Sequence, residues 1–364
     1  MVDDLMGWPF ELILIGRRRS LRSGLIGRQL KMRATCQMNR MNEASRRIAG
    51  CVLTVSLRLL SLAVLVAPLT YGQIQASEEG HAVFVSQRNG ASQLYLLDLS
   101  TRQISQLTDT GRGHFEPMAS TGGNSLVFTS RQGAGFELYR ADLGSAWRSR
   151  LPLLVGLSRL TMNVSDEISP SLTADGRTIV FASGDGIETM NSTGTGRRVI
   201  LPRTAGVIDL SPVVSPDGQT IAFISNRGDL NADRYDIWLF SRGSGEARQL
   251  TRGSDALGGL SWSGDSRSLA FTTTATSTRK TGIGLAEVET GSFRILSEQN
   301  DSNPSLSARG DRLLFVSSRD GDQELYLLNL NSGRVERLTY SAGLDDSPIF
   351  LATPNVGRPS RATR

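Results

Sequence analysis

The stretch SPVVSPDGQTIAFISNRG, from Ser211 to Gly228, has the pattern of two short β-strands joined by a tight turn. Asp217-Gly218 is expected at the turn, because glycine adopts a positive φ without a clash at Cβ. The residues TIAFIS that follow alternate apolar and polar side chains around Phe223, as strands with one buried face do. The segment therefore predicts an antiparallel hairpin.

This hairpin pattern recurs along the chain. Aligned on their phenylalanines, the six copies are 42 to 53 residues apart, at Phe84, Phe128, Phe181, Phe223, Phe271 and Phe315. Eleven residues before the phenylalanine, four copies have a proline and the fifth has a leucine: Pro117, Pro170, Pro212, Pro304 and Leu260. A third strand with an aromatic residue and a fourth strand follow in most copies, often ending in Leu-Thr. Four strands in a unit of this length are typical of a β-propeller blade.

The two ends of the repeat region complement each other. The first copy starts at Ala82 without the proline-led strand, whereas residues 345–351 repeat that strand and nothing else. The last strand is therefore expected to complete the blade that the N-terminal strand begins, which satisfies the edge of an open ring. The fold predicted is all-β, a six-bladed propeller over residues 77–353 with four antiparallel strands per blade. We expect a monomer, with a disordered tail at 354–364.

Residues 41–76 have the features of a signal peptide. An apolar run over residues 51–69 follows Arg46-Arg47, and small or polar residues come after it. An uncleaved membrane anchor is the alternative. Residues 1–40 fit poorly before a leader, so we interpret them as a non-native or extended N-terminus. The location expected is the periplasm or the outside of a bacterial cell.

The amino-acid composition of the chain excludes several classes of function. The net charge of +5 comes from residues 1–76, which hold 11 Lys/Arg and 4 Asp/Glu, whereas the remainder holds 29 and 31. The predicted mature chain is therefore slightly acidic, and no basic patch for nucleic acid is expected. Both cysteines, Cys36 and Cys51, lie within residues 1–76, which excludes thiol chemistry in the predicted mature chain, and the whole chain has two histidines, which excludes histidine-rich metal sites.

The Ser-Pro-Asp-Gly, Ile-Ala-Phe and Ser-Asn-Arg-Gly elements of the repeat resemble the propeller repeat of the TolB family. The resemblance covers residues 82–353. It implies the propeller fold, but that fold hosts many functions. The N-terminal α/β domain of TolB, through which it contacts the Tol proteins of the inner membrane, has no counterpart in the expected domain plan. Similar propellers in prolyl-oligopeptidase-like hydrolases accompany a hydrolase domain with a G-x-S-x-G motif, which this sequence lacks.

Acidic residues recur at the start of each blade, three residues before the proline or close to that position. We expect them to line one mouth of the central channel and to form the partner-binding site: His114, Glu116, Asp166, Glu167, Asp209, Asp255, Asp301, Asp345 and Asp346. A ring of carboxylates repels itself, so a basic peptide, a cationic ligand or Ca²⁺ would stabilise it. The residues that would hold Ca²⁺ are Glu167, Asp209, Asp301 and Asp345. The alternative is structural, with each acid bonded within its own loop.

The function expected is that of an exported, non-catalytic scaffold that binds a protein or peptide of the cell envelope and needs no cofactor. The alternative is a hydrolase or lyase that acts on saccharide or peptide, with paired channel carboxylates as acid and base. The arginines of the second turn, Arg88, Arg131, Arg227 and Arg319, are interpreted as partners in blade-to-blade or surface ion pairs.

Overall fold

The described part of the chain is built from β-strands. The structure, a computed structural model, describes residues 80–351 except 121–122, 134, 144–153, 164 and 231–233. These residues belong to one compact unit, Thr70–Arg364. They form 24 strands in six antiparallel four-stranded sheets, with no α-helix in the ranges just given. The predicted six-bladed propeller is confirmed.

Each sheet has four strands, which we describe in order from the innermost to the outermost. The innermost strands are β24 (Asp345–Leu351), β4 (His114–Ala119), β8 (Ile168–Leu172), β12 (Asp209–Val214), β16 (Ala256–Trp262) and β20 (Asp301–Leu306). The second strands, which carry the repeated phenylalanine, are β1 (His81–Ser86), β5 (Ser125–Gln132), β9 (Thr178–Ser183), β13 (Thr220–Ser225), β17 (Ser268–Thr273) and β21 (Arg312–Ser317).

Two further strands complete each sheet. The third strands are β2 (Gln93–Asp98), β6 (Gly135–Leu143), β10 (Gly186–Asn191), β14 (Asp236–Ser241), β18 (Gly282–Glu287) and β22 (Glu324–Asn329). The outer strands are β3 (Ile104–Gln106), β7 (Leu154–Arg159), β11 (Arg198–Pro202), β15 (Ala247–Gln249), β19 (Phe293–Ser297) and β23 (Val335–Arg337).

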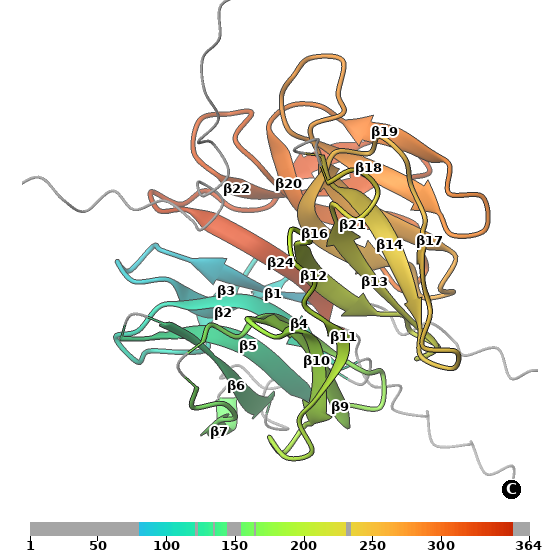
Figure 1. The fold of residues 1–364 in the computed structure, drawn as a ribbon. Helices are drawn as coiled ribbons and strands as arrows, with labels where there is room; N and C mark the ends of the chain where they lie inside the picture. Colours follow the sequence, from blue (N-terminus) through green and yellow to red (C-terminus); the bar gives the residue numbers. More distant parts are fainter. Residues whose placement is uncertain are drawn as a thin grey trace, which may run out of the picture. The chain divides into compact units, whose positions relative to one another are not determined.

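The last strand closes the ring as the sequence predicts. β24 pairs antiparallel with β1, with Leu351 opposite His81 and Asp345 opposite Ser86, in the sheet order β24-β1-β2-β3. Figure 1 shows the red β24 beside the blue β1, although the two are at opposite ends of the described chain. The first blade therefore has four strands like the others.

The six repeated phenylalanines form the core. Each is 0% exposed, and they are the largest fully buried side chains among the described residues. Phe315 of β21, for example, shares a buried cluster with Ala270 of the neighbouring sheet. They fill the space within and between blades, as expected, and fix the radial packing that surrounds the channel.

Candidate functional site

Each innermost strand bulges opposite the repeated phenylalanine. In the fourth blade Leu210 pairs with Ile224 and Val213 with Ala222, so Ser211 and Pro212 together oppose Phe223. The same shift in register recurs in the other five sheets. A bulge of this kind places two residues against one and re-aims a side chain. It explains the spacing of eleven residues between proline and phenylalanine.

The first residue of each bulge has a left-handed backbone. These six residues, which we name the collar, have φ between 47° and 61°: Glu116, Ser169, Ser211, Gly259, Asn303 and Ser347. This backbone conformation is unfavourable for residues with a Cβ, and it is kept where the surrounding structure enforces it. At Gly259 the close approach of the next blade also requires glycine, because a Cβ would lie 2.9 Å from the Asn303 Cα.

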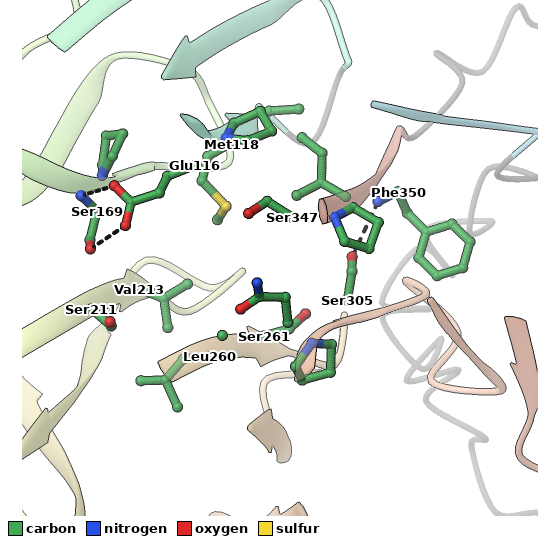
Figure 2. Close-up of a pocket in the computed structure, with 18 of the residues that line it drawn as sticks. Glu116, Met118, Ser169, Ser211, Val213, Leu260, Ser261, Ser305, Ser347 and Phe350 are labelled. Carbon is green, nitrogen blue, oxygen red and sulfur yellow. Dashed lines mark hydrogen bonds between the residues drawn. The ribbon is translucent and has the colours of Figure 1, made fainter. Parts of the chain in front are cut away.

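The collar lines a cavity of about 210 Å³ to which all six innermost strands contribute residues. Figure 2 shows side chains from these strands, with Glu116, Ser211 and Ser347 labelled, arranged around it. Apolar groups form much of the wall, including Met118 and Leu260. The remaining lining residues are Pro117, Ala119, Ser169, Pro170, Pro212, Val213, Gly259, Ser261, Asn303, Pro304, Ser305, Pro348, Ile349 and Phe350.

Hydrogen bonds between blades hold this wall in place. The Ser169 N–H and hydroxyl donate to the Glu116 carboxylate at 2.7 and 3.0 Å, which links β8 to β4. Further links join successive innermost strands through the Ser171, Ser261 and Ser305 hydroxyls, which accept from the backbone N–H groups of Val214, Leu306 and Phe350. The cavity is therefore preformed, as ligand sites commonly are.

Two carboxylates give the cavity its charge. Glu116 is partly exposed on the wall. Asp346 lies behind it, 6% exposed, and accepts from Asn303 Nδ2 at 2.6 Å and from the Ser347 N–H at 2.5 Å. Burial raises the pKa of Asp346 to about 6 against these hydrogen bonds, and the charge of Glu116 adds to the rise.

Most of the predicted channel acids lie in ion pairs outside the cavity lining. Asp345, Asp209 and Asp301 pair with the second-turn arginines of their own sheets at 2.9, 2.6 and 2.9 Å: Arg88, Arg227 and Arg319. Arg88 and Arg319 also lie over the core rings Phe84 and Phe315. Each of the three arginines thus bridges strands of its own blade to a buried acid, whereas blade-to-blade or surface ion pairs were expected. Arg131 is exposed.

The other predicted site residues differ from blade to blade. Glu167 is 0% exposed and pairs at 2.9 Å with Arg197, which also pairs with Glu188. Asp166 accepts from the Phe136 N–H at 2.8 Å.

His114 replaces the acid of the second blade, and Asp255 is the nearest acid in the fifth. His114 is buried, and its Nε2 lies 2.6 Å from the Thr110 hydroxyl. Burial lowers the pKa of His114 to about 4, so its ring is neutral at pH 7. Asp255 lies 3.7 Å from Arg234.

Calcium binding by Glu167, Asp209, Asp301 and Asp345 stays a prediction. Each of these carboxylates has an arginine nitrogen within 2.9 Å. In the part of the chain that the structure describes, no three His, Cys, Asp or Glu side chains gather as metal ligands would. The arrangement favours arginine as the counter-ion.

Sequence reasoning missed most of the collar. Of the nine predicted site residues, Glu116 lines the cavity and Asp346 lies directly behind it. The predicted site does not include four collar residues, although each directly precedes a repeated proline: Ser169, Ser211, Asn303 and Ser347. The position before the proline could have identified these residues from the sequence, because a proline inside a strand marks a bulge or an edge strand.

Comparison with known proteins agrees with this architecture. The family model described as the TolB beta propeller domain matches residues 77–237 and 220–355. The chain belongs to the TolB β-propeller family. Among solved structures, TolB from Acinetobacter baumannii superposes with a TM-score of 0.63 at 17% identity, covering 75% of this chain and 66% of that one. The structure from Agrobacterium tumefaciens described as putative TolB gives 0.55 at 19% identity, covering 75% and 91%.

Two curated relatives are similar to this chain over a limited length. A TolB homolog of Chlorobium chlorochromatii is 30% identical over 36% of this chain and 29% of its own length. An uncharacterized peptidase of Bacillus subtilis, YuxL, is 30% identical over 38% of this chain and 20% of its own. The chain thus covers less than a third of the length of either relative.

The predicted leader, residues 41–76, and the predicted tail, residues 354–364, lie outside the described residues. Within the described ranges, no helix has the length and apolar character needed to cross a membrane.

Proposed function

We propose that this TolB-family propeller is an exported, non-catalytic scaffold that recognises a protein or peptide partner at the channel face. The observation that carries the proposal is the preformed cavity on the propeller axis, lined by six collar bulges. A concave, largely apolar site with a few convergent polar groups is the kind of site that accepts a ligand segment. The location proposed is the periplasm or the cell exterior.

The enzyme alternative rests on paired channel carboxylates as acid and base, with Asp209 and Asp301 as the residues whose replacement would test it. In the structure both are held by arginines at 2.6 and 2.9 Å, and neither belongs to the residues that line the cavity. This geometry favours binding over acid–base catalysis, since a general acid or base must reach the substrate.

A peptide selection tests the proposal. A library of random peptides displayed on phage is panned against the immobilised propeller, and enriched peptides are titrated by calorimetry. We expect binding to wild type and a loss of at least about tenfold with Met118→Trp, which fills the cavity with a bulky side chain. Leu157→Trp, at a side chain 45% exposed outside the lining, is the matched control. Peptides that bind both variants equally would contradict the channel site.

A further inference from the structure

The cavity wall offers hydrogen-bond acceptors more than donors. Five of its residues are prolines, which have no backbone N–H: Pro117, Pro170, Pro212, Pro304 and Pro348. Three of the collar N–H groups are already used, because Ser169 donates to Glu116, Ser347 to Asp346 and Asn303 to the Thr272 hydroxyl. A ligand that donates hydrogen bonds therefore fits the wall better than one that accepts them.

The charge of the wall also favours a ligand that donates hydrogen bonds. Glu116 is the one ionisable side chain among the described lining residues, which include no lysine, arginine or histidine. Its carboxylate accepts three hydrogen bonds, all from neutral groups: the Ser169 N–H, the Ser169 hydroxyl and, at 2.9 Å, the Thr129 hydroxyl. These bonds orient the carboxylate without neutralising it. Asp346 behind the wall adds negative potential when it is ionised.

The rest of the wall suits a short alkyl chain. Met118, Val213 and Leu260 lie around the same cavity as Glu116 (Figure 2). A group with a charged end and a methylene stem would place its stem against these side chains and its head at the carboxylate.

We propose that the cavity binds a primary alkylammonium group, with Glu116 as its counter-ion and the collar hydroxyls as further acceptors. The inference rests on the proposed function, in that the group would belong to the protein or peptide partner. A lysine side chain and a chain amino terminus both supply this chemistry.

Small probes test the inference without a known partner. Backbone amide shifts of the ¹⁵N-labelled propeller are followed while n-butylammonium chloride, protonated alaninamide or the neutral 1-butanol is added. The probes are taken up to about 0.2 M, since so few heavy atoms limit affinity. We expect saturable shifts at collar amides and at least about tenfold tighter binding of one cation than of 1-butanol. Preference for n-butylammonium indicates a lysine side chain, and preference for alaninamide an amino terminus.

Variants identify the counter-ion. Glu116→Gln keeps the shape of the side chain: its amide oxygen can accept from the Ser169 N–H and the Thr129 hydroxyl, and the Ser169 hydroxyl can turn to accept from its NH₂ group. It should weaken the cation about tenfold and leave 1-butanol unchanged. Glu289→Gln, which makes the same charge change at an exposed residue, should alter neither. Ser211→Arg places a cation on the wall itself and should abolish cation binding even if Glu116→Gln fails to fold.

Three outcomes would overturn the inference: no saturable shift with either cation, equal affinity for 1-butanol, or undiminished cation binding in a folded Glu116→Gln or Ser211→Arg protein. A failure of the peptide selection alone would count against the proposed function and not against the cation site, because these probes need no peptide.

Discussion

Replacing Asp346 with asparagine should stabilise the propeller at neutral and alkaline pH. The carboxylate is 6% exposed, and burial raises its pKa to about 6 from the ordinary 3.8. The folded chain therefore holds this proton more tightly than the unfolded chain does. Stability is lost as pH rises from about 4 to about 6, because the carboxylate must then ionise in a buried site.

The magnitude follows from the two pKa values. The difference between about 6 and 3.8, at about 1.4 kcal/mol per pH unit, corresponds to about 3 kcal/mol above pH 6. Asparagine has no charge to bury, and its carbonyl oxygen can still accept from Asn303 and Ser347. We therefore expect a gain of about 1–3 kcal/mol at pH 8 and little gain at pH 4.

Urea denaturation followed by tryptophan fluorescence measures this difference at pH 4, 6 and 8. The decisive quantity is the change with pH in the free energy of unfolding of Asp346→Asn minus that of wild type. Asp322→Asn, at an exposed aspartate, is the control and should shift by no more than about 0.5 kcal/mol at any pH. A difference that stays constant from pH 4 to pH 8 would refute the reasoning, whatever its sign.

Three further changes test the ring and its ion pairs. Phe315→Ala should lower the free energy of unfolding by about 3–5 kcal/mol in chemical denaturation, whereas Val335→Ala, at a side chain 40% exposed, should change it by less than about 0.5 kcal/mol. Arg319→Met leaves the fully buried Asp301 unpaired and should cost about 3–5 kcal/mol, against at most about 1 kcal/mol for Arg102→Met, whose partner Glu336 is 40% exposed; equal losses would contradict the role of burial. A chain that ends at Leu344 lacks β24 and should lose cooperative thermal unfolding, while one that ends at Thr353 keeps it, and an unchanged melting temperature in the shorter chain would argue against closure through β24.

The fold was predictable because its signals are local and repeated. Asp217-Gly218 marks a turn, TIAFIS marks a half-buried strand, and six copies of one pattern leave few architectures open. The closure of the ring was equally predictable from the sequence, since a strand missing before Ala82 is present after Leu344.

The site was harder to predict because the acids have partners that are distant in sequence. Asp345 pairs with Arg88, 257 residues away, and a sequence shows neither that contact nor the burial that favours it. The sequence predicts that eight acids and His114 line one mouth of the channel, whereas the bulge turns the residue just before the proline toward the axis. An offset of two residues, as from Asp209 to Ser211, decides which side chain meets a ligand, and composition carries no information about it.

The bulge separates two tasks between two paired strands of each blade. Phenylalanine and the residues that pair beside it maintain the packing of the blades, while the first residue of the bulge contributes a side chain to the axis and little to the core. Five of the six collar positions tolerate a Cβ, and Gly259 alone is fixed by its neighbour. A propeller of this design can therefore change its ligand by substitutions at five collar positions, while the phenylalanine packing that holds the blades together stays the same.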